Sequence, residues 1–154
     1  MKKYTPAQAK EKIQHYCAYQ ERSHKEVRNK LYEYGLFSNQ VEDLLSELIT
    51  EGFLNEERYA KAFAGGKFRI KKWGKIKIIH ALEAQGLNKN CIKTGLKEIS
   101  PEDYHKTLSD LLTRKNELLS EDNDFVRRDK LAKYAIQKGY ESDLVWRFLK
   151  EEIN

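Results

Sequence analysis

Three segments of this chain share one outline: IIHALEAQGL at 78–87, VRNKLYEYGL at 27–36 and LAKYAIQKGY at 131–140. Each ends in a glycine followed by an apolar residue, and the three glycines, Gly35, Gly86 and Gly139, lie 51 and 53 residues apart. Glycine is common directly after a helix because the chain there often adopts a positive φ angle. We therefore predict that each segment is a helix that ends at its glycine.

Apolar residues occupy matching positions around the three glycines. The matching positions are eight and four residues before the glycine and one, six and ten residues after it. Around Gly35 they hold Val27, Leu31, Leu36, Val41 and Leu45; around Gly86, Ile78, Leu82, Leu87, Ile92 and Leu96; and around Gly139, Leu131, Ala135, Tyr140, Val145 and Leu149. Apolar spacing elsewhere is also helical, and few prolines interrupt it. We predict an all-α fold of three tandem three-helix repeats (1–54, 55–99 and 100–154), each resembling a helix-turn-helix, stacked into an elongated, curved body.

Residues able to cap a helix precede most of the apolar runs. They are Ser23, Ser38, Asn55, Asn88, Ser100 and Ser142. Ser23 is followed three residues later by Glu26, which is the spacing of a capping box. The helix after Asn55 is expected to run to about Lys72 and to break at Trp73 and Gly74. The residues 120–124 are polar and are expected to form a loop.

Residues typical of a catalytic or metal site are scattered. Cys17 and Cys91 lie far apart and are expected to be small buried apolar residues. The four histidines have no carboxylate or cysteine at ligand spacing, and Gly65-Gly66 lacks the Lys and Ser/Thr of a phosphate-binding loop. Those glycines instead suggest a kink or a close helix contact. We expect a protein that is not an enzyme and has no cofactor and no metal.

No stretch of the sequence is apolar enough to cross a membrane. Hydrophobic residues make up 40% of the 154 residues and charged residues 34%, and a bilayer span needs about 20 consecutive apolar residues. The first residues, Met1 to Tyr4, have no apolar run behind them. We expect a cytoplasmic, monomeric protein without a membrane partner.

The residues 58–82 carry an unusual charge pattern. The chain's formal net charge is +5, and this segment alone contributes +8 because it contains no Asp or Glu, so the remaining residues sum to −3. A local field of one sign indicates a polyanionic partner or an acidic protein surface. The predicted DNA- or partner-binding residues are Arg58, Lys61, Lys67, Arg69, Lys71, Lys72, Trp73, Lys75 and Lys77.

Two alternatives for this basic segment stay open at this point. If the helix continued through Trp73 and Gly74, Arg69 with Lys72 and Lys71 with Lys75 would share a helical face; if the helix bends there, the cations surround the junction. Trp73 could stack on a nucleobase or fill the joint between two helices. A solvated cationic face with no partner is the simplest interpretation, but such faces normally mix charges of both signs.

Two motifs resemble the RecX family of regulatory proteins. Residues 22–31, RSHKEVRNKL, are similar to that family's Arg-Ser-x-x-Glu-(apolar)-x-x-Lys-Leu stretch, and residues 52–60, GFLNEERYA, to its Gly-(apolar)-Leu-(Asp/Asn)-(Asp/Glu)-x-Arg-(Tyr/Phe)-Ala element. The basic run with Lys72-Trp73-Gly74 lies where the family carries its central Lys/Arg-rich segment. The resemblance spans the whole chain, is strongest over 22–87 and is faint in the third repeat. Gly65 and Gly66 depart from the polar or charged residues usual there.

The resemblance implies a non-enzymatic modulator of the recombinase RecA. Such a protein would lodge in the groove of the RecA–single-stranded DNA filament, inhibit strand exchange and promote disassembly, in DNA repair, recombination and the SOS response. Two other functions remain open. A helix-turn-helix unit could read DNA without RecA, with Ser38-Asn39-Gln40 at the start of a recognition helix, or the repeats could form a scaffold for an unrelated acidic protein.

Overall fold

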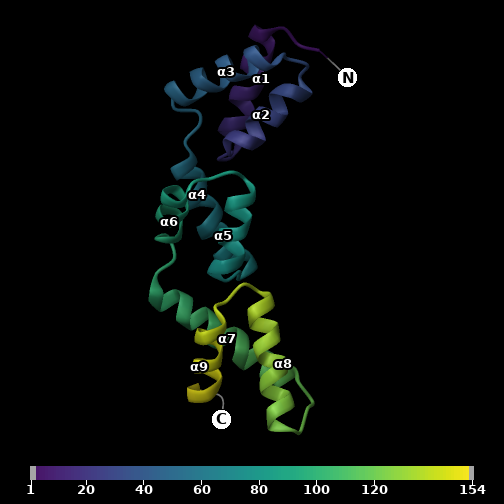
Figure 1. Cartoon of the computed structure of the whole chain (residues 1–154), viewed down its shortest axis with the longest axis vertical. Helices are drawn as coiled ribbons and strands as arrows, with labels where there is room; N and C mark the ends of the chain where they lie inside the picture. The colour runs from purple at the N-terminus through teal and green to yellow at the C-terminus, as the bar shows by residue number, and fades with distance from the viewer. Residues whose placement is uncertain (1–2, 153–154) are drawn as a thin grey trace. The chain divides into compact units, whose positions relative to one another are not determined.

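Every regular element in the described residues, 3–152, is a helix, and the computed structural model shows how they follow one another (Figure 1). The elements are α1 (Pro6–Tyr19), α2 (His24–Glu33), α3 (Ser38–Thr50), α4 (Glu56–Gly66), the π-helix η1 (Lys67–Lys71), α5 (Lys75–Ala84), α6 (Lys89–Leu96), α7 (Pro101–Leu118), α8 (Asp124–Gln137) and α9 (Ser142–Glu152). The predicted all-α class is confirmed. Residues 1, 2, 153 and 154, which the predicted repeats include, lie outside the described range.

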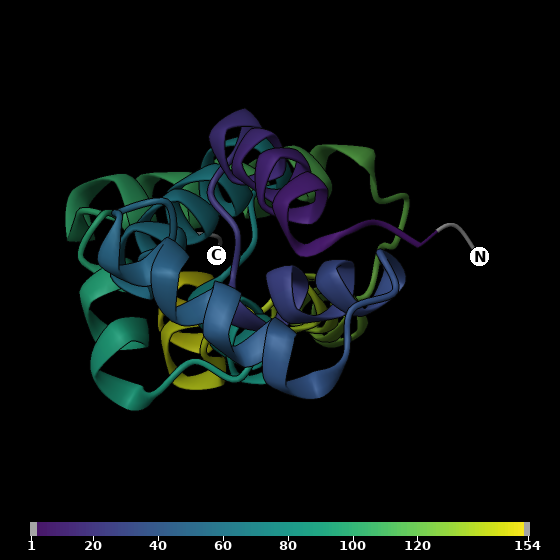
Figure 2. The ribbon, with the colours of Figure 1, turned by 90° about the horizontal axis from the view of Figure 1, so that it is seen from above.

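The described residues fall into two compact units. The first contains residues 3–62 and 82–95. Within it α1, α2 and α3 pack pairwise against one another, as the purple-to-blue ribbon in Figure 2 shows. Their shared core is fully buried and includes Ile13, Leu31 and Leu48. Burial of these amphipathic faces is the main source of stability for such short helices.

The second unit contains residues 63–81 and 96–152. Its three long helices, α7, α8 and α9, also pack pairwise. Leu108, Leu131 and Leu149, one from each helix, are fully buried. The segment 63–81 belongs to this unit, so most of the basic residues predicted to bind a partner are built onto the last three helices of the chain.

The three repeated glycines end their helices as predicted. Gly35, Gly86 and Gly139 have φ angles of 87°, 82° and 105°. In each case the N–H of the following residue donates to the carbonyl four positions before the glycine, at 3.4, 3.3 and 3.2 Å for Leu36, Leu87 and Tyr140. The apolar residues four positions before and one position after each glycine are therefore joined by a backbone hydrogen bond across the same turn. All residues of the matched columns are buried except Leu96, which is partly exposed.

Most of the predicted helix caps are present, and two are wrong by one residue. The side chains of Ser23, Asn55, Asn88 and Ser100 each accept from a backbone N–H three positions on. Ser38 and Ser142, by contrast, are the first residues of their helices. The cap position of α3 is Phe37, whose side chain cannot accept a hydrogen bond; its N–H donates to Gln40 Oε1 at 2.9 Å, which is the reciprocal half of a capping box.

No helix within residues 3–152 combines the length and the apolarity that crossing a membrane requires. The longest, α7, has 18 residues and carries charged side chains along its length. Such a helix is amphipathic and buries one face only.

Candidate functional site

The backbone of the basic segment is irregular. Helix α4 ends at Gly66, the π-helix η1 covers Lys67–Lys71, and Lys72 adopts a left-handed conformation with φ 60° and ψ 32°. The next helix begins at Lys75. The predicted break at Trp73 and Gly74 is therefore present, and the cations surround a junction rather than share one helical face. We call residues 72–75 the joint.

The two glycines before the π-helix have different surroundings. A Cβ atom at Gly65 would lie 2.8 Å from the Arg69 guanidinium, whereas one at Gly66 would meet nothing within 4 Å. Gly65 therefore makes room for an arginine side chain of its own helix. The change from α- to π-helix directly after Gly66 fits the predicted kink; close contact with another helix is not seen at Gly66.

The turn between α8 and α9 holds the joint in place. The Gly74 N–H donates to Lys138 O at 2.8 Å, and the Ile76 N–H donates to Gly139 O at 2.9 Å. The backbones at Gly74 and Gly139 approach so closely that a Cβ atom on Gly74 would overlap the Gly139 carbonyl carbon and the Tyr140 nitrogen. Only glycine fits at position 74.

Two buried tyrosines complete this attachment. Tyr140 Oη donates to the Lys72 carbonyl at 2.9 Å. Tyr104 Oη accepts from the Lys75 N–H at 2.9 Å and donates to the Glu141 carboxylate. Burial, together with the Glu141 hydrogen bond, raises the pKa of Tyr104 far above its ordinary value. The Lys72 carbonyl and the Lys75 N–H, at the two ends of the joint, are thus both satisfied by tyrosine side chains.

The first two predicted site residues are paired with carboxylates. Arg58 Nε lies 3.0 Å from Glu21 Oε2, and its terminal nitrogen donates to Gly52 O at 3.0 Å. Lys61 Nζ lies 3.7 Å from Glu57 Oε1 on the same helix. These two positions are therefore less available to an anion than their place in the basic run predicts.

Trp73 lies between two lysines. Lys67 Nζ is 5.1 Å and Lys77 Nζ 4.7 Å from the centre of its ring system. The Phe63 ring meets it edge to face, with the centres 6.3 Å apart. Trp73 is half-buried, so it takes part in the packing of the joint while its ring attracts both ammonium groups by cation–π interaction.

The remaining predicted cations separate into two environments. Arg69, Lys71 and Lys72 are exposed around Ile70, whose side chain is 78% exposed. Lys75 instead lies with its Nζ 4.7 Å from the centre of the Tyr104 ring, and it lines a pocket that also contains Glu141 and Asp143. No carboxylate in residues 3–152 forms an ion pair with Lys67, Arg69, Lys71, Lys72, Lys75 or Lys77.

Helix α8 and the residue after it contribute side chains that the sequence alone did not suggest. Tyr134, Gln137 and Lys138 line a pocket of about 220 Å³ together with Trp73 and Lys77, and none of these side chains is acidic. Lys138 Nζ also donates to Lys71 O at 3.3 Å. These residues lie just before Gly139, which the sequence marks as a helix end. Nothing in the sequence indicates that the turn at Gly139 contacts the joint.

The described residues contain no group of three or more His, Cys, Asp and Glu side chains placed to hold a metal ion. Cys17 is buried, and burial raises the pKa of its thiol to about 11. Cys91 is half-buried rather than buried, which corrects the expectation for that residue. Neither thiol has the lowered pKa of a reactive cysteine.

Comparison with known proteins identifies the family of this chain. Two family models match the chain, described as "RecX, second three-helix domain" over residues 55–96 and "RecX, third three-helix domain" over residues 102–149. The chain belongs to the RecX family. The joint lies in the part matched by the second RecX domain, and the turn that holds it lies in the part matched by the third.

Sequence relatives carry the name "Regulatory protein RecX". The one from Clostridium perfringens is 29% identical over 124 residues, which cover 79% of this chain and 58% of that protein. The one from Prosthecochloris aestuarii is 26% identical over 136 residues, which cover 88% of this chain and 87% of that protein. The chain thus spans little more than half of the clostridial relative.

Solved structures of RecX proteins share the fold. One, titled "Crystal structure of regulatory protein RecX", is 22% identical, with a TM-score of 0.85 over 96% of this chain and 72% of that chain. RecX from Lactobacillus salivarius is 19% identical, with a TM-score of 0.85 and 95% of both chains covered. At these identities the likeness supports the fold alone.

Proposed function

We propose that this protein is a non-enzymatic regulator of RecA that binds the RecA–single-stranded DNA filament and inhibits the recombinase. Membership of the RecX family supports a role as a RecA regulator, because relatives across several bacteria are named regulatory proteins. Inhibition, cytoplasmic location and action as a monomer belong to the same proposal, as does the division into repeats at 1–54, 55–99 and 100–154.

One observation supports the joint as the contact with the filament. Six cations of the segment 67–77 have no carboxylate partner in the described residues, although the same chain pairs Arg58 and Lys61 with acids. A cluster of unpaired cations is stabilised when an anion binds, because phosphate or carboxylate groups remove the mutual repulsion. DNA phosphates and an acidic protein surface both meet this requirement.

The hydrogen bonds at the joint support a preorganised contact. Lys72 and Lys75 are fixed through their backbones by Tyr140 and Tyr104, so binding need not order this part of the chain. Preorganisation increases affinity by reducing the entropy lost on binding. The flexible side chains of Arg69 and Lys71 can still adapt to anions at different spacings.

Sequence-specific DNA reading by α3 has less support. Its first residues were the candidates for base contacts, but Gln40 Oε1 accepts from the Phe37 N–H, and Ser38 Oγ accepts from Tyr32 Oη at 3.4 Å. Both polar groups already stabilise the start of the helix. DNA binding without RecA therefore remains the alternative function, with cationic side chains as its contacts and no preference for sequence.

The proposal is tested by the single-strand-dependent ATPase of the RecA from the same organism. Adding this protein is expected to lower the steady-state rate, and a variant with Arg69→Ala, Lys71→Ala and Lys77→Ala is expected to need about tenfold more protein for the same effect, as expected from losing a few charged contacts. A control with Lys93→Ala, Lys97→Ala and Lys106→Ala removes the same charge from other exposed positions. An unchanged ATPase at a saturating ratio of wild-type protein would overturn the proposal.

A further inference from the structure

A second cationic surface lies in the first unit, away from the basic segment in sequence. A pocket of about 490 Å³ is lined by four tyrosines and four basic side chains and by no acidic residue. The tyrosines are Tyr4, Tyr16, Tyr19 and Tyr34, and the basic residues are Lys12, His15, Arg22 and Lys30. We call it the tyrosine pocket. No motif in the sequence indicated it, because its residues come from three separate segments.

Contacts within the tyrosine pocket hold several cations over aromatic rings. The Arg22 guanidinium lies 3.7 Å from the centre of the Tyr16 ring, and Arg22 Nε donates to the Tyr16 carbonyl at 3.0 Å. Lys30 Nζ lies 5.5 Å from the same ring centre. The two cations are thus placed beside one ring, where the quadrupole of the ring offsets part of their repulsion.

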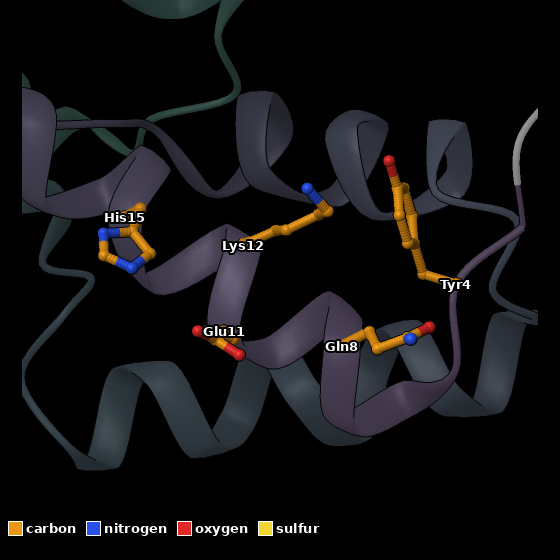
Figure 3. Close-up of a pocket in the computed structure, with 5 residues that line it drawn as sticks. All are labelled: Tyr4, Gln8, Glu11, Lys12 and His15. Carbon is orange, nitrogen blue, oxygen red and sulfur yellow. The ribbon is translucent and has the colours of Figure 1, made fainter.

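The other end of the pocket is built from the start of the chain. Lys12 Nζ lies 4.8 Å from the centre of the Tyr4 ring, and Figure 3 shows the Lys12 side chain extending toward that ring; Glu11 lines the adjoining pocket, which shares Tyr4, Lys12 and His15. The Tyr4 and Tyr34 rings meet edge to face with centres 5.4 Å apart, and the Tyr4 N–H donates to Tyr34 O at 3.0 Å. The segment before α1 is thereby attached to the end of α2.

The cations of the tyrosine pocket differ in whether they have an acidic neighbour. Lys30 has one acidic neighbour, Glu33, at 3.9 Å, whereas Lys12 and Arg22 form no ion pair within the described residues. Tyr19 is 83% exposed, and the Arg22 guanidinium lies 6.0 Å from the centre of its ring. A large aromatic ring left in water beside unpaired cations has a hydration cost that a bound planar ring would remove.

We propose that the tyrosine pocket binds single-stranded DNA, with bases stacking on tyrosine rings and phosphates contacting Lys12, Arg22 and Lys30. Single-strand-binding surfaces combine these two elements, aromatic rings for the bases and cations that follow the backbone. An acidic peptide would satisfy the cations but leave the rings without planar partners, so the four tyrosines favour nucleic acid. This contact goes beyond the proposed function, because it assigns a separate site that acts without RecA.

The test uses the full-length protein, a short oligothymidylate and no RecA. A variant with Lys12→Ala and Tyr19→Ala is expected to bind the oligonucleotide about tenfold more weakly, since one stacked base and one phosphate contact are lost. The matched control, Lys106→Ala with Phe125→Ala, removes one exposed cation and a ring that is also 83% exposed, but from the second unit. It is expected to bind as the wild type does.

Two further measurements separate the possible outcomes. An abasic oligonucleotide of equal length keeps the phosphates and is expected to bind about tenfold more weakly. Photocrosslinking with 5-iodouracil is expected to label the tryptic peptide of residues 13–22, which contains Tyr16 and Tyr19. Equal binding by the abasic strand or by oligoglutamate, equal losses in the variant and its control, or no label on that peptide would overturn the proposal. None of these outcomes depends on whether the protein acts on RecA.

Discussion

Arg58 and Lys61 lie on a regular helix with a carboxylate beside each, whereas Arg69, Lys71 and Lys77 lie around an irregular joint and have no carboxylate partner within residues 3–152. Both groups belong to one acid-free run of sequence. The difference arises because Glu57 is one helical turn before Lys61 and because Glu21, far away in the chain, lies beside Arg58. An acid-free stretch of sequence is therefore not an acid-free surface.

The two groups also differ in what holds their backbone. Around Arg58 the helix is stabilised by its own hydrogen bonds and by the Asn55 cap. At the joint the backbone is held by Tyr104, Tyr140 and the Gly139 turn. In the second arrangement uncharged side chains hold the backbone, while the cations make contacts of their own: Lys67 and Lys77 with the Trp73 ring, and Lys72 Nζ with Arg69 O at 3.0 Å. Variants can separate these two roles.

The largest expected effect is that of Gly74→Ala. The new Cβ would overlap the backbone of Gly139 and Tyr140, so we expect a loss of about 3 kcal/mol in the free energy of unfolding, measured by urea denaturation. Gly66→Ala is the matched control, because Gly66 has helical angles and open space around it. It is expected to stabilise by about 0.5–1 kcal/mol. Equal stabilities for the two variants would contradict the close approach at Gly74.

Tyr104→Phe is expected to cost about 1–3 kcal/mol, since it leaves the Lys75 N–H without its acceptor in a buried position. It should also change the response to pH. The folded-state pKa of Tyr104 is raised by burial, so its contribution is complete below the ordinary tyrosine value of 10.0 and is lost as the pH rises above it.

The pH effect is measured by urea unfolding between neutral and alkaline pH. The wild type should lose at most about 1.4 kcal/mol per pH unit above pH 10 from this group, and Tyr104→Phe should remove that part of the slope. An identical alkaline slope in the two proteins would show that the phenol is not buried as described. Tyr32→Phe, at a partly exposed position, serves as the control.

The charges themselves are compared by binding to single-stranded DNA over a range of salt concentrations. The variant Arg69→Ala, Lys71→Ala, Lys77→Ala is expected to lose about tenfold in affinity and to reduce the salt slope by about 2, as for three phosphate contacts. Arg58→Ala with Lys61→Ala is expected to change the slope by less than about 1, because acids already neutralise both cations. Equal slopes for the two variants would remove the distinction between the groups.

The smallest expected effect is on stability. Arg58→Ala should lower the free energy of unfolding by less than about 1 kcal/mol, because its ion pair with Glu21 is substantially exposed. The loss of its hydrogen bond to the Gly52 carbonyl adds little, since water can reach that group. Chemical denaturation measures this effect, and a loss above about 2 kcal/mol would mean that the pair is structural.

The repeat pattern predicted the helices well because its signals are local. A glycine after a helix and a capping side chain before one act within a few residues, and Gly35, Gly86 and Gly139 all adopt positive φ. The caps at Ser38 and Ser142 were misplaced by one residue, because each serine is itself the first residue of its helix. The ends of a helix are therefore harder to predict than its presence, because they shift easily by one or two residues.

The candidate site was predicted only in part because its partners lie far along the chain. Local composition was enough to predict the basic residues and the break in the helix at Trp73 and Gly74. The contact between Gly74 and Gly139 joins residues 65 positions apart, and no period or motif indicates it. Lys75 was grouped with the other cations, yet the same contact turns it toward Tyr104 and acidic neighbours.

Co-sedimentation with RecA filaments formed on single-stranded DNA tests the central claim most directly. We predict that wild-type protein pellets with the filaments, that the Arg69→Ala, Lys71→Ala, Lys77→Ala variant remains largely in the supernatant, and that the Lys93→Ala, Lys97→Ala, Lys106→Ala control pellets as the wild type does. Circular dichroism should be the same for all three. Equal pelleting of the joint variant and the wild type would contradict the claim that these cations contact the filament.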